Sequence, residues 1–586
     1  MTESVGCILG TKEATPLKFW VKVNGDSVLR LDDVVEVRAR RPDSGEVVRF
    51  FGVVDYVRTL MEGASLDSDT SLAASGIVPA EISYAAQVQV TRIEPEEYFA
   101  PQPGESVEIA QGESLREALY FDTMEQRIPA GLMRNGSPVY LNYEFINGEK
   151  GAHINISGIS GVATKTSFAL FLLYSIFHAE VLGTERANTK AIIFNVKGED
   201  LFFLDKENAS LDLDNRERYQ QLDLPVEPFR NVRFAASPKP GTEMVQPNLN
   251  QRAENIHTYL WSLREVCREN LFRFLFAGDD LERGNLGFLV NSMSEKLFRL
   301  AQKNDKRDRK NNDEPGSHLE TDEAYRSGKT KVETFGELID YLDFKLLLEE
   351  EGGGDWFGRT APATAEALIR RLAGIKREMS TVIRGDLPPE EIQQYQFDPL
   401  DPAYQLSIVD INKLPSKAQK FVVGVLLQKL FLEKEKRGQN PVVFIVLDEL
   451  NKYAPREGQS PIKDLLVEIA ERGRSLGIIL IGAQQTASEV ERRVVGQAAI
   501  RVVGRLDSAE AERSEYNFLG TVCRQRSLLL KSGSMFVQQP QVPTPLLVQF
   551  PFPPYATRRK EVGEPEDQQE KLAEALSVFD DDDMPF

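Results

Sequence analysis

The segment GISGVATKTS, from Gly158 to Ser167, combines glycines, hydroxyl residues and a lysine between an expected strand and an expected helix. A helix N-terminus presents free backbone N–H groups and the positive end of the helix dipole, which together favour an anion. Lys165 is placed to reach the β- and γ-phosphates of a nucleotide, and the Thr166 hydroxyl to bind Mg²⁺. The pattern indicates a phosphate loop.

The loop departs from the usual spacing G-x-x-x-x-G-K-[ST]. Nine residues run from Gly158 to Thr166, where eight are expected, and Ala163-Thr164 replace the last glycine. If Lys165 fixes the register, Ile159 and Thr164 occupy the glycine positions. The alternative is a glycine-rich turn with a solvent-facing lysine. On the first interpretation the nucleotide-binding residues are Gly158, Gly161, Ala163, Thr164, Lys165, Thr166 and Ser167.

A second site follows the apolar run VVFIVL, which ends in Asp448-Glu449. Two adjacent carboxylates at the end of a buried strand are costly without a partner. A Mg²⁺–phosphate group is such a partner: Asp448 and Thr166 would hold the metal, and Glu449 would polarise the attacking water. Together with the upstream loop, the pair predicts ATP and Mg²⁺ as cofactors.

Three further segments carry polar residues at expected strand ends. GIILIGAQQ ends in Gln484-Gln485, and a polar side chain there is a candidate sensor of the γ-phosphate. Arg472 and Arg474 precede that strand, and an arginine there is a candidate to stabilise charge at an adjoining subunit's nucleotide, or a surface residue. NVKGED places Asn195 and Glu199 after another strand, either at the ligand crevice or in a turn.

Composition restricts the class of protein. The 586 residues carry 70 Lys+Arg and 90 Asp+Glu, a net charge of −20, which excludes a generally basic nucleic-acid coat but leaves a local basic channel possible. No CxxC pair occurs, and the apolar stretches fall short of the ~20 residues that span a membrane. We expect a cytoplasmic chain without a membrane segment.

The elements that position these residues divide the chain. Residues 1–98 contain short Val/Ile-rich runs with alternation, which predict a small β-barrel, and 99–127 is expected to be a linker. Strand, loop, helix and strand then indicate a parallel α/β core in 128–244 and 401–555. The interval 245–400 is predicted to be a helical insertion and 556–586 an acidic tail. The charged stretch Lys303–His318 inside the insertion is expected to be a disordered loop, with a basic DNA-contacting loop as the alternative.

This order of motifs resembles the HerA branch of the FtsK/HerA hexameric DNA translocases. The resemblance covers about residues 1–555 and rests on FNVKGED, VDINKLP, VLDEL and GRSLGIILIGAQQ in sequence. It implies an N-terminal HAS-barrel, a RecA-like P-loop core with a helical insertion, and a homo-hexamer that threads double-stranded DNA. It also implies the Walker A role for Lys165 and Thr166, the Walker B role for Asp448 and Glu449, the sensor role for Gln484 and the trans-acting arginine finger for Arg474.

The resemblance implies a partner as well. HerA ATPases act with the NurA nuclease in DNA end resection and recombinational repair, and some bacterial relatives serve effector enzymes in anti-phage defence. The irregular phosphate loop favours a second hypothesis, an ATP-binding ring scaffold for such an effector. A conjugation- or secretion-type coupling ATPase is a third hypothesis, and the missing membrane segment argues against it.

The last eight residues, Phe579–Phe586, read FDDDDMPF and resemble the acidic tip of bacterial single-stranded DNA-binding proteins. A terminal aromatic can enter an apolar pocket while the Asp run steers the encounter. The tail is therefore either a docking peptide for partners that read that tip or a solubilising end.

Overall fold

The computed structural model describes residues 4–62, 67–77, 79–159, 165–242, 244–276, 286–325, 328–348, 356 and 361–563. The chain folds into two compact units. The first comprises Met1–Phe145 and Ala499–Phe550, and the second comprises Ile146–Ala498 and Pro551–Phe586.

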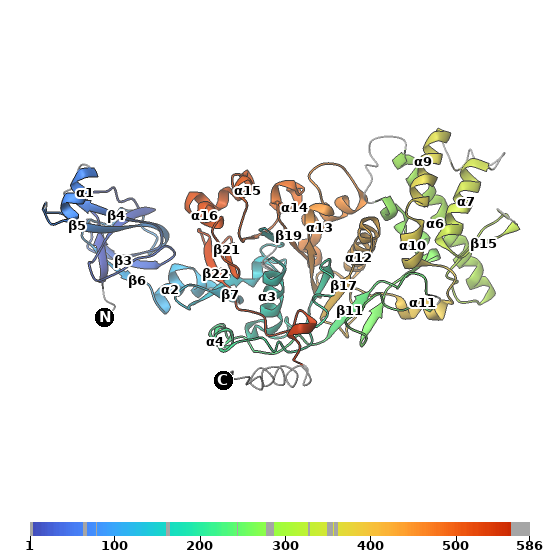
Figure 1. Ribbon diagram of the computed structural model, residues 1–586, viewed down its shortest axis with the longest axis horizontal. Coiled ribbons are helices and arrows are strands. Elements are labelled where there is room, and N and C mark those ends of the chain that lie inside the picture. Colours follow the sequence, from blue (N-terminus) through green and yellow to red (C-terminus); the bar gives the residue numbers. More distant parts are fainter. Residues whose placement is uncertain are drawn as a thin grey trace, which may run out of the picture. The chain divides into compact units, whose positions relative to one another are not determined.

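The first unit contains a closed antiparallel barrel of the order β1-β2-β5-β4-β3-β6, drawn in blue in Figure 1. Its strands are β1 (Ser4–Ile8), β2 (Lys18–Val23), β3 (Val34–Arg40), β4 (Val47–Glu62), β5 (Glu81–Glu94) and β6 (Ser106–Ile109). Alternate side chains such as Phe19, Val37, Phe50 and Val88 are fully buried and fill the barrel. The helix α1 (Asp67–Ala74) lies between β4 and β5. The predicted barrel is confirmed.

The barrel extends past the boundary predicted from the sequence. Strand β6 pairs with both β1 and β3 and closes the barrel, yet it lies within the 99–127 segment expected to be a linker. The same segment also forms the helix α2 (Glu113–Ala118). A four-residue strand that has only one fully buried side chain, Val107, shows too little alternation to be recognised in isolation.

A second set of paired strands in the first unit joins segments far apart in sequence. The antiparallel order β20-β21-β22-β7-β8 pairs the end of the chain with residues that follow the barrel. Its strands are β7 (Arg127–Leu132), β8 (Pro138–Asn142), β20 (Ile500–Val503), β21 (Ser534–Gln538) and β22 (Leu546–Gln549). Gly131 lies at φ 138°, and a side chain there would collide with the Gln549 carbonyl 2.9 Å away. These strands, which the sequence assigned to the α/β core, cluster instead with the barrel.

The second unit is built on seven strands in the order β12-β11-β17-β10-β18-β19-β9. Each pair among them is parallel. The strands are β9 (Ile154–Ser157), β10 (Thr189–Asn195), β11 (Val232–Ala236), β12 (Ile256–Thr258), β17 (Leu406–Asp410), β18 (Val442–Asp448) and β19 (Ile478–Gln484). The carboxyl ends of all seven strands therefore meet at one edge, as the predicted parallel core requires.

Helices of the second unit pack against this sheet or against one another. They are α3 (Lys165–His178), α4 (Leu213–Gln221), α12 (Ser416–Arg437), α13 (Pro461–Leu476) and α14 (Arg492–Gly496). Almost every side chain of α3 is buried, which accounts for its apolar sequence. The chain after β22 returns to this unit, where Tyr555 is buried against Tyr174 and Phe229. Residues 556–563 of the expected tail thus belong to the fold, and Phe579–Phe586 lies outside the described residues.

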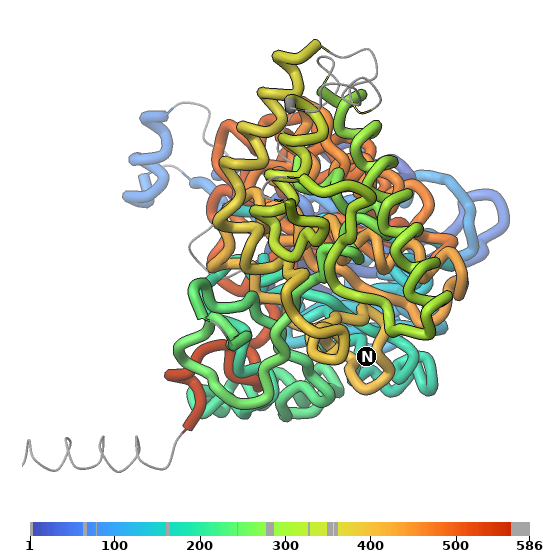
Figure 2. The backbone as a smooth tube through the Cα atoms, turned by 90° about the vertical axis from the view of Figure 1, so that its right-hand side faces the viewer, coloured from blue at the N-terminus to red at the C-terminus, as the bar shows by residue number. Residues whose placement is uncertain are grey.

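The predicted helical insertion is present between β12 and β17. Its helices are α5 (Leu263–Arg268), α6 (Leu286–Asn311), α7 (Phe335–Asp343), α9 (Pro362–Ala373), α10 (Lys376–Val382) and α11 (Pro389–Tyr395). Helices α6, α7, α9 and α10 lie side by side, coloured green to yellow in Figure 2. One hydrophobic core continues from these helices into the parallel sheet.

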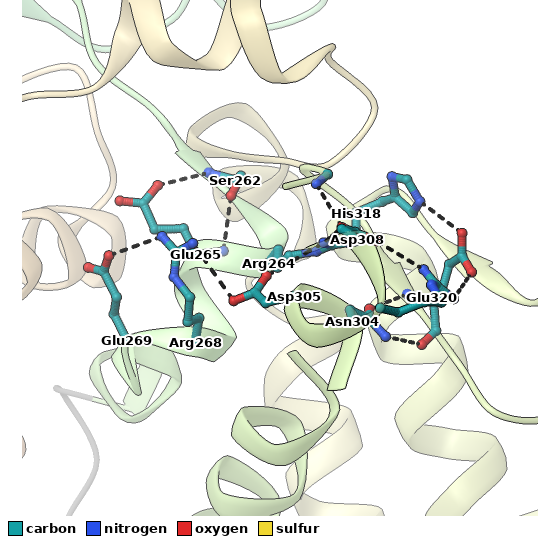
Figure 3. A network of polar contacts seen from close by, with 12 residues as sticks. Ser262, Arg264, Glu265, Arg268, Glu269, Asn304, Asp305, Asp308, His318 and Glu320 are labelled. Atoms are coloured by element: carbon teal, nitrogen blue, oxygen red, sulfur yellow. Dashed lines mark hydrogen bonds and ion pairs between the residues drawn. The ribbon is translucent and has the colours of Figure 1, made fainter. Parts of the chain in front are cut away.

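A buried polar network corrects the expected disorder of Lys303–His318. Residues 303–311 continue α6, and Figure 3 shows Asp305 and Asp308 of this helix directed at the arginines of α5. The Arg264 guanidinium is 1% exposed, pairs with Asp308 and donates to the His318 carbonyl at 2.8 Å. Asn304 exchanges two hydrogen bonds with the Glu320 backbone, at 2.7 and 2.8 Å. The charged residues are thus partners within the fold, and a buried arginine requires them.

No helix in the described part of the chain combines the length and the apolar composition that a bilayer crossing demands.

His153 locks β9 to its neighbours and gives the fold a pH dependence. Its Nδ1 accepts the Leu480 N–H at 2.9 Å, its Nε2 lies 3.0 Å from the Ala470 carbonyl, and burial lowers the pKa of the ring to about 4. The neutral ring is the native form, so stability is retained above the ordinary pKa of 6.5 and is lost as the pH falls from there towards 4.

We expect acidification from pH 7 to 5 to cost the second unit about 2 kcal/mol through this residue. Thermal unfolding followed across this pH range measures the effect. His153→Gln cannot titrate, so its melting temperature should fall less steeply with acid than that of the wild type. Equal slopes in the two proteins would contradict the assignment.

Candidate functional site

Polar side chains line the carboxyl edge of the parallel sheet. The strands β9, β19, β18, β10 and β17 end in Ser157, Gln484, Asp448, Asn195 and Asp410, and all five are buried. Segments separated by more than three hundred residues are thereby brought to one crevice. Such an edge is where open parallel sheets bind ligands.

Lys165 begins α3 directly beyond this edge. Its side chain is buried, with the residue only 4% exposed, and Nζ donates to the Gly158 carbonyl at 2.7 Å. Burial lowers the pKa of this ammonium, and the negative charge of Asp448 opposes the shift. The lysine therefore faces the site, and the alternative of a solvent-facing side chain is wrong. Ser167 follows in the first turn of α3, while Gly161, Ala163 and Thr164 lie outside the described residues.

Thr166 and Asp448 meet across the site. The Thr166 hydroxyl donates to Asp448 Oδ2 at 2.9 Å. Lys197 brings its ammonium to the same two groups, 2.5 Å from Thr166 Oγ1 and 2.8 Å from Asp448 Oδ2. One hydroxyl, one carboxylate and one cation thus form a closed triangle at the carboxyl edge of the sheet.

The electrostatics of Asp448 follow from this triangle. Burial alone raises the pKa of the carboxyl, but the Lys197 ammonium, the Thr166 hydroxyl and the charge of Lys165 together bring it below its ordinary value. Its second oxygen, Oδ1, accepts the backbone N–H of Glu449 at 2.9 Å. The carboxylate is therefore ionised at neutral pH with both oxygens engaged.

Glu449 adopts an unusual backbone conformation. Its φ is 56°, in the left-handed region that disfavours residues with a side chain. The carboxylate is half-buried and pairs with Lys452, one turn further along the chain. Strain of this kind is retained where the surrounding structure holds a side chain in place for a task.

Gln484 is fully buried between β19 and β9. Its Nε2 donates to the Asn155 side chain and to Ser157 Oγ, the latter at 3.2 Å. Among the described residues Gln484 Oε1 has no hydrogen-bond partner. An unpaired acceptor of this kind is costly, and a ligand that donates a hydrogen bond would relieve it.

Arg474 does not join this cluster. It lies near the end of α13, four residues before β19 begins, and therefore at the opposite edge of the sheet from Gln484. Its guanidinium donates to the carbonyls of Gly148, at 3.2 Å, and Glu149. Arg472 pairs with Glu435 and Glu468 on the helix surface. An arginine at this edge has no access to the polar cluster at the carboxyl edge of its own sheet.

The NVKGED segment forms the next wall of the site. Asn195 Nδ2 donates to the Gly198 and Asp200 carbonyls at 2.6 and 2.9 Å, which shapes the turn after β10. Glu199 accepts the backbone N–H groups of Asn250 and Gln251 and pairs with Lys413. The segment is thus both a turn and part of the crevice. Beside it, burial raises the pKa of Asp410 to about 7.

Lys197 and Asn155 are among the residues of the site that were not singled out from the sequence. Lys197 lies two positions beyond the strand end at Asn195, and its proximity to Asp448 depends on β10 and β18 being neighbours. Asn155 lies inside the buried strand β9, between two isoleucines. A buried polar side chain needs a polar partner, so its position in this apolar strand was a signal that it contacts a polar group of a neighbouring strand.

The donor set suits a magnesium ion. Mg²⁺ prefers hard oxygen ligands and binds through one or two protein groups together with phosphates and water. Thr166 and Asp448 supply a hydroxyl and an ionised carboxylate, and they already hold a cation, the Lys197 ammonium. These side chains therefore fit the metal that the sequence predicted.

No protein-family model and no curated protein sequence matches the chain. Among solved structures it is similar to the plasmid coupling protein TrwB in complex with ADP and Mg²⁺, at 13% identity over 76% of this chain and 95% of that chain, with a TM-score of 0.43. It is also similar to VirB4 of Thermoanaerobacter pseudethanolicus, at 14% identity over 73% of this chain and 97% of that chain, with a TM-score of 0.44. A shorter match is the genome packaging NTPase B204 of Sulfolobus turreted icosahedral virus 2, at 18% identity over 25% of this chain and 69% of that chain, with a TM-score of 0.20. These identities are too low to transfer a residue role to this chain.

The strain at Glu449 predicts an unusual response to glycine. Glu449→Gly relieves the left-handed backbone, so we expect it to be more stable than Glu449→Gln by about 1 kcal/mol. Thermal unfolding of the two variants measures the difference. Glu433→Gly, within the ordinary helix α12, is the control and should lose about 1 kcal/mol. A glycine at 449 that destabilises as much as the one at 433 would contradict the assignment of strain.

Proposed function

We propose that this chain is a Mg²⁺-dependent ATPase whose nucleotide site lies at the carboxyl edge of the parallel sheet. The observation that carries the proposal is the contact of Thr166 with Asp448 at 2.9 Å, with a cation already bound to both. Lys165, at the N-terminus of α3, supplies a second cation beside them, and this one is buried. A hydroxyl, a carboxylate and an ammonium at a strand–helix junction are the parts of a phosphate-loop site.

The residues have separate tasks in hydrolysis. Lys165 exchanges the Gly158 carbonyl for phosphate oxygens, and backbone N–H groups at the start of α3 bind the same anion. Bound Mg²⁺ would be held by Thr166 and Asp448 and would offset the charge that builds up on the phosphates. Glu449 accepts the proton of the attacking water, and the unpaired Gln484 Oε1 orients that water.

We further propose that the ATPase is a homo-hexameric double-stranded DNA translocase. The order of motifs, the barrel that precedes the core and the helical insertion within it support a HerA-type machine with a HAS-barrel and a RecA-like core. The position of Arg474, away from its own site, supports a role at the nucleotide of an adjoining subunit. A net charge of −20 limits DNA contact to a narrow basic lining of the pore.

The cellular setting that this proposal favours is the cytoplasm, with a NurA-type nuclease as partner in end resection and recombinational repair. The alternative is an ATP-binding ring scaffold for an effector of anti-phage defence. On this proposal, the tail Phe579–Phe586 contacts proteins that read the tip of single-stranded DNA-binding protein. Removal of its last three residues should weaken such binding without altering ATP hydrolysis.

ATP hydrolysis with and without linear duplex DNA tests the proposal directly. We expect stimulation by DNA in the wild type and a loss of at least about a hundredfold in Lys165→Ala and in Glu449→Gln. Glu449→Gln should still bind nucleotide, whereas Lys165→Ala should not. Nucleotide binding without turnover in the wild type would instead favour the scaffold.

A mixing experiment tests Arg474. If this arginine acts on a neighbour's nucleotide, Arg474→Ala alone should lose at least about a hundredfold in turnover. Mixed rings of Arg474→Ala with Lys165→Ala should regain part of it, because some interfaces then pair an intact site with an intact arginine. Arg472→Ala, on the same helix, is the matched control and should retain activity. The absence of any recovery in mixed rings would rule out the trans role.

A further inference from the structure

We propose that Lys197 is a built-in cation that takes the place of Mg²⁺ between Thr166 and Asp448, leaves when the metal binds, and thereby sets the metal dependence of nucleotide binding. The inference rests on the proposed nucleotide site and adds a competitor for its metal. It assigns a positioning role to a residue that has no place in the hydrolysis steps above.

Lys197 Nζ contacts the same two oxygen atoms that would bind the metal. It lies 2.5 Å from Thr166 Oγ1 and 2.8 Å from Asp448 Oδ2, the two groups that would hold Mg²⁺. The other oxygen of Asp448 is already engaged by the Glu449 N–H. An ammonium and a divalent cation cannot share these oxygens, because like charges at such short range repel strongly. Binding of one therefore requires departure of the other.

The structure lets the side chain of Lys197 leave while its backbone stays. The side chain is 42% exposed, so its ammonium can move into water on a flexible four-carbon stem. The backbone is held by Asn195, whose side chain accepts the Lys197 N–H at 3.1 Å and donates to the Gly198 and Asp200 carbonyls. Lys165 differs, since it is buried and bound to the Gly158 carbonyl.

Lys197 affects nucleotide binding both without and with metal, and both effects reduce its dependence on Mg²⁺. Without metal, Lys197 neutralises Asp448, so the phosphates of a nucleotide do not face a bare carboxylate. With metal, displacement of Lys197 costs free energy and weakens metal binding. Removal of the ammonium should therefore weaken metal-free nucleotide binding and strengthen the binding of Mg²⁺.

The test is equilibrium binding of a fluorescent ADP, N-methylanthraniloyl-ADP, to the full chain in EDTA and across a Mg²⁺ titration. The quantity compared is the ratio of the Kd in EDTA to the Kd in saturating Mg²⁺. We expect Lys197→Met to raise this ratio at least about tenfold over the wild type and to lower the half-saturating Mg²⁺ concentration several-fold. Lys197→Gln, a second neutral variant, should behave in the same way.

Two controls separate charge from general effects. Lys197→Arg keeps a cation at the position and should stay within about threefold of the wild-type ratio. Lys436→Met removes an ammonium from the surface of α12, where it pairs with Glu433, and should leave the ratio unchanged. A ratio that is unchanged or lower in Lys197→Met, with nucleotide still bound, overturns this inference alone. A wild type that binds no nucleotide in either condition overturns the proposed function and the inference together.

Discussion

A buried negative charge at the end of β18 is the constraint around which the site is arranged. Asp448 is 6% exposed, and a carboxylate in that position is tolerable only beside a cation. Lys197 provides that cation, Thr166 adds a hydrogen bond, and the charge of Lys165 contributes from the start of α3. The groups that stabilise the ionised carboxylate in this structure are thus also those proposed to exchange for metal and phosphate.

The parallel sheet makes this arrangement possible. Strands β9, β10, β18 and β19 belong to separate parts of the sequence, and their parallel pairing brings every carboxyl end to the same edge. The interiors of these strands are apolar, so polar side chains concentrate at the ends. His153, held between Ala470 and Leu480, fixes β9 relative to β19 and therefore the start of the loop that leads to Lys165.

Local patterns in the sequence were enough to predict the barrel and the parallel core. They also singled out Thr166 and Asp448 as residues for one metal ion, and the structure brings these two side chains into contact. Features that depend on distant pairing were not predictable. Strand β6 is recognisable only by its pairing with β1 and β3. The charged end of α6 is ordered because Asp308 on this helix pairs with the buried Arg264. Lys197 was missed for the same reason: its significance depends on β10 lying beside β18.

Lys165 and Lys197 carry the same charge, but the difference in their burial gives them different roles in the site. Both ammonium groups lower the pKa of Asp448. They differ in exposure, because Lys165 is 4% exposed whereas the side chain of Lys197 is 42% exposed. A buried ammonium that leaves its partner must find another inside the protein, so Lys165 can exchange the Gly158 carbonyl only for a ligand such as phosphate. An ammonium at the surface is rehydrated when it leaves, so Lys197 can yield its place at modest cost. The site therefore combines one buried cation with one solvent-accessible cation, and on the proposed function only the accessible one gives way to the metal.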